Sequence, residues 1–276
     1  MPFVDPLAEF AARHPYPDQL GLSSLYRFSS IPGKPEYLEA LFLKGKLYHA
    51  LPSEFNDPFE CKPHFSWPKT AANVQAIREH LVKTSMQHGK SEKEAQNLVN
   101  ESFNKPGFIE ETIRTTTDKV FGEIRICCFT QSNENLLFWA HYAGSHSGFC
   151  VEYDATKAPI RFAFRVAYQN NYPTIEYPRP NDARGFEPAL VKSKEWGYED
   201  EFRIVFVPEA PMQPKNDGES LLLSGDEVKN VYFGAKIDAH EKEKIIQLID
   251  EGPFDPGLWD TELSKSSFEL QFHQIR

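Results

Sequence analysis

The sequence predicts an α+β domain with a mostly antiparallel sheet and one helical insertion. Short segments in which apolar and polar residues alternate, as they do in half-buried strands, occur before about residue 69 and after about residue 120. Between them, apolar residues recur at the spacing of a helix face. A chain of 276 residues fits one large domain, and we expect a single domain over residues 1–276.

The first part of the chain is expected to form a strand, a helix and a second strand. Alternation predicts strands at residues 25–29 and 46–50. Residues 36–43 have a helical pattern that ends at Gly45. A loop over residues 51–60 follows.

The segment from about 69 to 120 is expected to be a helical insertion. Val74 and Ile77 fall at helical spacing, and Ser91 with Glu94 forms a capping box that opens another helix. The segment is rich in polar residues and contains no catalytic motif.

The sheet is expected to continue after the insertion. Alternation predicts strands at residues 123–130, 148–153, 161–168, 199–207 and 228–233, and an edge strand at 268–273. A short helix is expected at about 134–142 and a loop at about 170–185. A second helix is expected to begin after the N-cap Asp238 and to end at Gly252.

The composition indicates a soluble, cytoplasmic protein. The formal charge of −10 argues against broad electrostatic adhesion to nucleic acid or anionic membranes, but it allows a nucleic acid in a local basic patch. No stretch approaches the roughly 18 apolar residues of a membrane span, so no membrane partner is expected. The N-terminus lacks the pattern of a signal peptide. Cys61, Cys127, Cys128 and Cys150 form no C-x-x-C pair, which suits buried thiols in a reducing compartment.

An acid pair opens the strand expected at residues 199–207. Alternate residues on a strand point to the same face about 7 Å apart, so Glu199, Glu201 and Arg203 share one face. Such a pair can perform general acid–base or cation-stabilising chemistry if it is desolvated. The alternative is a solvated strand end whose Glu–Arg pair is worth less than about 1 kcal/mol.

The segment from Phe55 to Glu60 is expected to be a rigid polar turn. Asn and Asp bond their own backbone and proline fixes its φ, so we expect Asn56 and Asp57 to bond backbone groups of this turn. The turn is either a purely structural element or a preorganised loop at the mouth of a cleft.

Aromatic and histidine side chains gather on the short helix and its C-terminal turn. Trp139, His141, Tyr142 and His146 suit stacking against a planar ligand, and they equally suit a core helix. No nearby acid completes a metal-ligand set, so no metal is expected. Neither a G-x-G-x-x-G nor a Walker A loop is present, and chemistry would rest on carboxylates, arginine and aromatic residues.

Several motifs follow one another in a fixed order. They are L-Y-R-F from Leu25, F-N-D-P-F-E from Phe55, I-C-C-F from Ile126, W-A-H-Y-A from Trp139 and W-G-Y-E-D-E-F-R from Trp196. In this order they resemble a bacterial family known as domain-of-unknown-function family 2971, over about residues 24–235. The family name implies no activity.

The order of elements also resembles the ADP-ribosyltransferase superfamily, which includes DNA-modifying toxins. In that superfamily an opening strand carries a His or Arg, and a late strand begins with the catalytic glutamate. Arg27 corresponds to the first of these in this sequence. Glu199-x-Glu201 matches the E-x-E of arginine-directed members. The chain departs from the pattern because it lacks an S-T-S motif, with only Ser53 nearby, and because of its large insertion. The resemblance implies a split sheet of the ADP-ribosyltransferase type.

The resemblance further implies an NAD-consuming transferase or NAD glycohydrolase of bacterial defence, toxin or stress systems. NAD would be the co-substrate, and the acceptor would be a protein, a nucleic acid or a small molecule, with an antitoxin or defence protein as a further partner. Glu201 would stabilise the ribosyl cation and Glu199 would orient the acceptor nucleophile. The NAD-binding residues would be Arg27, Ser53, Trp139, His141 and Tyr142, and the surrounding site residues Asn56, Asp57, Glu60, His146 and Arg203.

Two other classes of function compete with this hypothesis. One is a non-catalytic module that binds a ligand or partner, in which the acid–arginine cluster is structural. The other is a nuclease or hydrolase that holds a divalent metal between Asp57, Glu60, Glu199 and Glu201.

Overall fold

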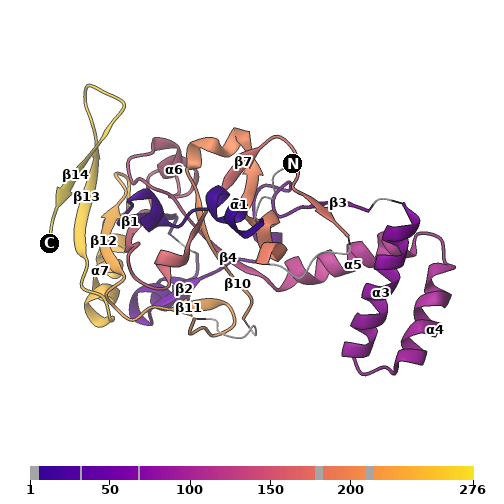
Figure 1. Cartoon of the computed structure of the whole chain (residues 1–276). Helices are drawn as coiled ribbons and strands as arrows, with labels where there is room; N and C mark the ends of the chain where they lie inside the picture. Colours follow the sequence, from indigo (N-terminus) through magenta and orange to yellow (C-terminus); the bar gives the residue numbers. More distant parts are fainter. Residues whose placement is uncertain (1–5, 32, 68, 178–182, 209–213) are drawn as a thin grey trace.

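The computed structural model describes residues 6–31, 33–67, 69–177, 183–208 and 214–276, and it confirms the α+β class with mostly antiparallel strands. Figure 1 shows a body of sheets, an arm formed by α3 and α4 on one side and the β13–β14 hairpin on the other. The strands are β1 (Ser24–Ser29), β2 (Lys46–Tyr48), β3 (His64–Ser66), β4 (Arg125–Phe129), β5 (Phe149–Asp154), β6 (Phe164–Arg165), β7 (Ala167–Gln169), β8 (Thr174–Glu176), β9 (Val191–Ser193), β10 (Phe202–Phe206), β11 (Ser220–Leu222), β12 (Val228–Phe233), β13 (Gly257–Leu263) and β14 (Leu270–Gln274).

The helices lie before or between these strands, and α3, α4 and α5 follow one another without a strand between them. The α-helices are α1 (Pro6–Arg13), α2 (Glu36–Leu38), α3 (Ala71–Gln87), α4 (Glu92–Phe103), α5 (Phe108–Glu123), α6 (Leu136–His141) and α7 (Ala239–Glu251). The 3-10 segments are η1 (Pro17–Leu20), η3 (Pro52–Glu54), η4 (Ile160–Phe162), η5 (Ala183–Leu190) and η6 (Lys194–Glu199). A wider, π-helical turn, η2 (Glu39–Leu43), continues α2, so the helix expected at residues 36–43 is confirmed.

Two main sheets share one backbone bridge within the described residues and diverge from it. The larger has the order β1-β5-β12-β13-β14 and the smaller has the order β4-β10-β6. Tyr26 in β1 and Thr130 after β4 exchange two backbone hydrogen bonds of 2.8 Å, which join the sheets at this one bridge. Beyond it β1 and β4 pair with other strands, so the sheets open away from each other.

The main core fills the space between the two sheets and is closed by α7. Buried apolar residues of β1, β5, β12, β4 and β10 form one cluster, with Ile245 and Ile249 of α7 packed on it. Asp238 caps α7 by accepting hydrogen bonds from His240 N (2.9 Å) and Glu241 N (3.2 Å), which confirms the expected helix start. Full burial of each such apolar side chain contributes about 1.5–3 kcal/mol.

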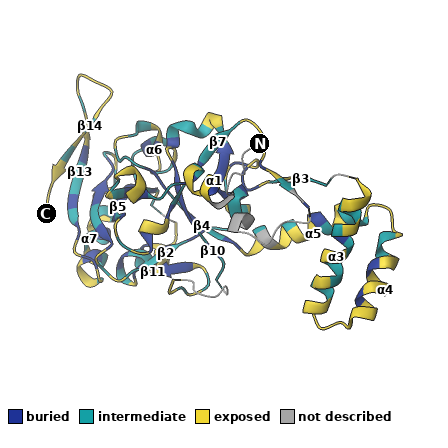
Figure 2. Ribbon diagram, in the orientation of Figure 1, coloured by how far each residue is buried: buried dark blue, intermediate teal, exposed yellow. Residues whose placement is uncertain are grey.

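The expected helical insertion is confirmed, and it forms the arm. Thr70 caps α3 and the predicted Ser91 capping box starts α4. Ile77 of α3 and Val99 of α4 are buried, whereas most of the α3 and α4 surface is exposed (Figure 2). The arm leaves the body through β3, which pairs in parallel with β8.

The strand expected at residues 161–168 is wrong as a continuous element. A 3-10 turn replaces its start, and the rest divides into β6, which pairs with β10, and β7, which pairs with β9. The buried Val166 between them donates its backbone N–H to Glu201 O at 2.9 Å, and the chain changes partner there. The loop expected at residues 170–185 contains β8, and residues 178–182 lie outside the described part.

Candidate functional site

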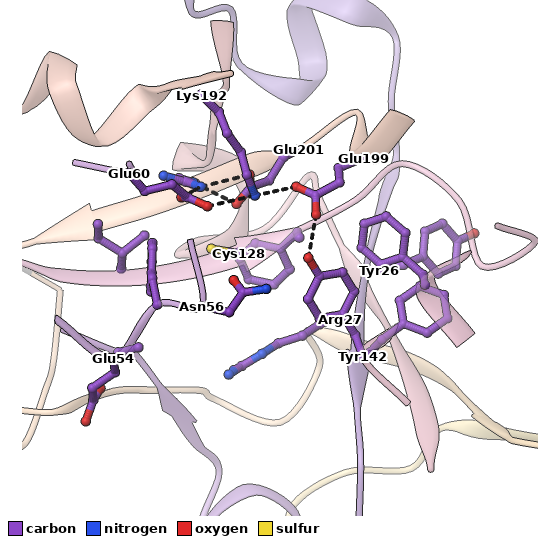
Figure 3. Close-up of a pocket in the computed structure, with 17 residues that line it drawn as sticks. Tyr26, Arg27, Glu54, Asn56, Glu60, Cys128, Tyr142, Lys192, Glu199 and Glu201 are labelled. Atoms are coloured by element: carbon purple, nitrogen blue, oxygen red, sulfur yellow. Dashed lines mark hydrogen bonds and ion pairs between the residues drawn. The ribbon is translucent and has the colours of Figure 1, made fainter. Parts of the chain in front are cut away.

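A cavity of about 300 Å³ lies where the two sheets diverge. Its walls come from β1, the turn after β2, β4, α6, β9 and the start of β10 (Figure 3). The polar side chains of these walls that are suited to ligand binding or catalysis are Arg27, Asn56, Tyr142, Lys192, Glu199 and Glu201. The residues come from distant parts of the sequence, and the split in the sheet brings them together.

Glu199 and Glu201 reach the cavity from a turn and not from one strand face. Glu199 ends η6, and Asp200 adopts a left-handed conformation with φ 43°. β10 begins only at Phe202, so the strand expected from Glu199 starts too early. Two side chains fix the backbone of this turn by hydrogen bonds. Thr130 Oγ1 donates to Glu199 O at 2.7 Å, and Glu201 N donates to Tyr168 Oη at 2.9 Å.

Lys192 of β9 joins three buried carboxylates. Its Nζ lies 2.5 Å from Glu199 Oε2, 3.0 Å from Glu60 Oε1 and 3.3 Å from Glu201 Oε2 (Figure 3). Sequence reasoning did not select Lys192 as a site residue. Its short strand carries no alternation long enough to recognise, and η6 is what turns residues 199–201 back onto it.

Arg203 completes the charged cluster from β10. Its Nε and Nη2 donate to the two carboxylate oxygens of Glu201 at 2.7 and 2.9 Å, and Nη2 also donates to Glu60. Its Nη1 donates to Ala189 O at 2.8 Å. The side chain is 0% exposed, so the alternative of a solvated strand end is wrong.

The two catalytic candidates differ in protonation. Burial raises the pKa of Glu201, but Arg203 and Lys192 outweigh it and hold this pKa at about 2. Burial and the negative charge of Glu201 raise the pKa of Glu199, against the opposing contacts of Lys192 and Tyr142. Glu201 is therefore the fixed anion of the cluster, and Glu199 is the group that binds a proton first on acidification.

The carboxylates also differ in how far their oxygens are occupied. Glu201 accepts two hydrogen bonds from Arg203 and one from Lys192. Glu199 accepts one from Lys192 at 2.5 Å and one from Tyr142 Oη at 2.5 Å. A carboxylate has about four acceptor positions, so Glu199 keeps more of them open for a ligand. Burial, followed by the hydrogen bond to Glu199, raises the pKa of Tyr142, which stays a donor.

Arg27 projects from β1 into the same cavity without an acidic partner. Its Nη1 donates to Tyr48 O at 3.1 Å, and it forms no ion pair with any residue that the structure describes. Glu54, which also lines the cavity, is engaged by Tyr48 Oη at 2.9 Å and by Leu51 N at 2.8 Å. The remaining guanidinium donors of Arg27 are therefore available to an anion.

The 55–60 turn is confirmed for Asp57 but not for Asn56. Asp57 Oδ1 accepts from Phe59 N at 2.9 Å, and its Oδ2 accepts from Trp196 Nε1 at 2.7 Å. No side-chain hydrogen bond of Asn56 occurs in the described part of the chain. In the view of Figure 3 its amide lies between the carboxylate cluster and Arg27, so Asn56 is a candidate ligand contact.

Five predicted site residues do not line the cavity, and Asp57, held by Trp196, is one of them. Ser53 is exposed on η3, and His141 is exposed at the end of α6. Trp139 is buried and donates Nε1 to Asn133 O at 2.7 Å, while His146 stacks on it with ring centroids 6.3 Å apart. Residues that bind one substrate must lie together: Arg27, Tyr142 and Glu201 do line one cavity, whereas Ser53 does not.

Two phenylalanine rings take the position expected for Trp139. Phe28 of β1 and Phe138 of α6 line the cavity beside Tyr142. Residues 138 and 142 are four apart and share a helix face, while Trp139 turns into the protein interior. When aromatic residues occupy two faces of a helix, the sequence does not indicate which face packs into the core.

Substitutions in the 55–60 turn are expected to distinguish a residue that stabilises the fold from a residue that contacts the ligand. Asp57→Ala removes the acceptor of Trp196 and should lower the free energy of unfolding by about 1–3 kcal/mol. Asn56→Ala removes no hydrogen bond of this kind and should leave the melting temperature nearly unchanged. Thermal unfolding of both variants checks this, and an equal loss of stability would return Asn56 to the scaffold.

Comparisons of the chain with protein-family models, with curated proteins and with solved structures found no match. Within the described residues, no helix is long and apolar enough to cross a membrane. No group of three or more His, Cys, Asp or Glu side chains there is arranged to hold a metal ion. The Lys192 ammonium lies between Glu60, Glu199 and Glu201, and Asp57 is directed to Trp196.

Proposed function

We propose that the protein is an NAD-consuming enzyme of the ADP-ribosyltransferase type, acting as a transferase or as an NAD glycohydrolase. One observation carries the proposal: Arg27, which has no acidic partner, and the desolvated carboxylate of Glu199 line the same cavity. The divergence of the sheets at Tyr26 and Thr130 supports it, since the superfamily is built on a split sheet. Membership of domain-of-unknown-function family 2971 is part of the same proposal.

NAD would bind through its pyrophosphate and its nicotinamide end. The guanidinium of Arg27 would hold the pyrophosphate by two parallel hydrogen bonds. These are charge-assisted and therefore stronger than hydrogen bonds from neutral donors. The rings of Phe28, Phe138 and Tyr142 offer an aromatic wall for the nicotinamide. Asn56 would donate its amide hydrogens to the ribose or phosphate between these two ends.

The chemistry would be displacement at ribose C1′. The bond from C1′ to the pyridinium nitrogen breaks, its electron pair stays with nicotinamide, and C1′ gains oxocarbenium character. The acceptor oxygen or nitrogen, or water, then forms the new bond to C1′ and loses its proton. Glu199 would contact a ribose hydroxyl and take up this proton, while Glu201 would supply the fixed negative charge. This division refines the sequence-based assignment, because the oxygens of Glu201 are largely occupied by Arg203 and Lys192.

The test is incubation of the purified protein with isotopically labelled NAD, with and without cell lysate. Nicotinamide release without lysate indicates glycohydrolase activity, and label on a macromolecule indicates transfer. Arg27→Met should weaken NAD binding in calorimetry while the fold is kept. NAD that stays intact with the wild-type protein would favour the binding-module hypothesis, and activity that requires a divalent cation would favour the metal-dependent hydrolase.

The pH profile should show the protonation of Glu199. Its ionised form is the active one and its pKa is raised above the ordinary 4.5, so nicotinamide release should fall on acidification at a higher pH than an exposed glutamate would cause. Tyr142→Phe removes a hydrogen bond that lowers this pKa. The acidic limb of kcat should therefore move to higher pH in Tyr142→Phe, and a limb that stays in place would contradict the assignment.

A further inference from the structure

A second hollow, which we call the acceptor groove, lies next to the cavity. It has a volume of about 680 Å³ and is lined by Phe59, Lys62, Asn170, Tyr172, Lys192 and Trp196, among others. Lys192 lines both spaces, and the 55–60 turn separates them. Phe55, Asn56 and Glu60 face the cavity, whereas Asp57 and Phe59 face the groove.

Two aromatic rings that line this groove are exposed. Phe59 is 66% exposed and Tyr172 is 42% exposed, although both are large and apolar. Trp196 is held by its hydrogen bond to Asp57, and the Lys192 ammonium lies 4.8 Å from the centre of its ring. Exposed rings of this kind act as stacking platforms for planar groups.

The groove is lined by as many cations as acids, in contrast to the acidic chain as a whole. Residues 61–78 and 155–175 contain Lys and Arg but no Asp or Glu, in a protein of net charge −10. These two segments meet in the β3–β8 ladder, whose start borders the groove at Lys62 and Pro173. Lys62 is exposed and has no ion pair among the residues the structure describes. Asp57 and Glu195 are the acids that line the groove.

The side-chain amides of Asn170 and Asn171 add polar groups beside the rings. Both line the groove, both are exposed, and neither side chain has a hydrogen bond within the described ranges. An amide presents a donor and an acceptor together, the combination that matches the edge of a nucleobase. Rings, unpaired amides and a cation free of ion pairs are the components with which proteins hold single strands.

We propose that the acceptor groove binds single-stranded nucleic acid and presents it to the cavity for ADP-ribosylation. The inference rests on the proposed function for its second half, whereas the binding itself needs no NAD. An unstacked base would lie on Phe59 and Tyr172, with Lys62 at a backbone phosphate. A nucleophilic oxygen or nitrogen of the strand would attack ribose C1′ across the 55–60 turn, release nicotinamide with its electron pair, and pass its proton to Glu199.

The test measures fluorescence anisotropy of a labelled oligothymidylate with the full chain in the absence of NAD. Phe59→Ala and Tyr172→Ala should each weaken binding at least about fivefold. Phe268→Ala and Tyr37→Ala, at rings that are 97% and 53% exposed elsewhere, are the matched controls and should leave the affinity unchanged. Lys62→Ala should reduce the salt dependence of binding. All four aromatic positions are exposed, so these variants should fold, and thermal unfolding checks this.

The groove proposal fails if the wild-type protein does not bind the single strand at low salt, if it binds a duplex equally well, or if groove and control variants behave alike. It also fails if NAD-derived label transfers to protein and never to the oligonucleotide. These failures leave nicotinamide release intact. Conversely, binding of the single strand without any NAD consumption would support the groove and overturn the proposed function alone.

Discussion

Glu199→Gln is expected to slow nicotinamide release by about 100- to 1000-fold. The carboxylate is buried and already oriented by Lys192 and Tyr142, so it can stabilise the ribosyl cation without reorganising. Glutamine preserves the shape and one acceptor oxygen but removes the negative charge. Measurement of kcat with saturating labelled NAD gives the effect directly.

A buried glutamate remote from the cavity serves as the matched control. Glu227 is equally buried, and it accepts hydrogen bonds from Ser224 N and Gly225 N. Glu227→Gln should keep kcat near the wild-type value, whatever it does to stability. Glu201→Gln should lower both turnover and melting temperature, because the cavity loses its fixed negative charge and Arg203 keeps only Glu60 as a charged partner among the described residues. Wild-type turnover in Glu199→Gln would end the role proposed for that residue.

Arg203→Leu is expected to destabilise the fold by about 3–5 kcal/mol. The guanidinium is fully buried and contacts Glu201, Glu60 and Ala189 O, so its loss leaves two buried carboxylates with Lys192 as their remaining cation. A loss of this size corresponds to roughly 6–20 °C in melting temperature for a domain of about this length. Thermal and denaturant unfolding measure it.

Arg114→Leu is the control for the loss of an arginine in general. Arg114 pairs with Glu111 and Asp118 on the exposed face of α5, and its replacement should leave the melting temperature nearly unchanged. Equal effects of the two substitutions would mean that the buried cluster contributes no more than a surface pair.

The wild-type cluster should also weaken in acid. Because the pKa of Glu201 lies at about 2 in the folded protein, below the ordinary 4.5, its contribution is complete above pH 4.5 and is lost as pH falls through 2.

The sequence was informative where a pattern is long and local. The strands at β1, β5 and β12 and the helices of the arm and α7 follow from alternation, helical spacing and caps, and they occur where expected. β9 was missed because three residues are too few for a periodic pattern. β13 was missed as well, although its pairing with β14 is what makes the C-terminal strand an edge.

The candidate site was predictable in its residue types and less so in its geometry. Glu199, Glu201 and Arg203 lie within five residues of the sequence, so their proximity required no knowledge of the fold. The left-handed conformation of Asp200 was not apparent, since Asp adopts it only in a suitable context. Asn56 enters the cavity from a turn and Lys192 from the short strand β9, and both placements depend on tertiary contacts. Burial of the whole cluster is a property of the packed sheets.

The buried cluster and Arg27 give the cavity electrical polarity. Three carboxylates face two cations at one side, so one negative charge is uncompensated there when all three are ionised. Arg27 places a positive charge without an acidic partner elsewhere on the cavity wall. A molecule with a cationic ring and an anionic linker therefore gains energy in one direction of entry and loses it in the other. The wall charges select orientation before any specific contact forms, and a uniformly anionic molecule of the same size is repelled from the carboxylate side.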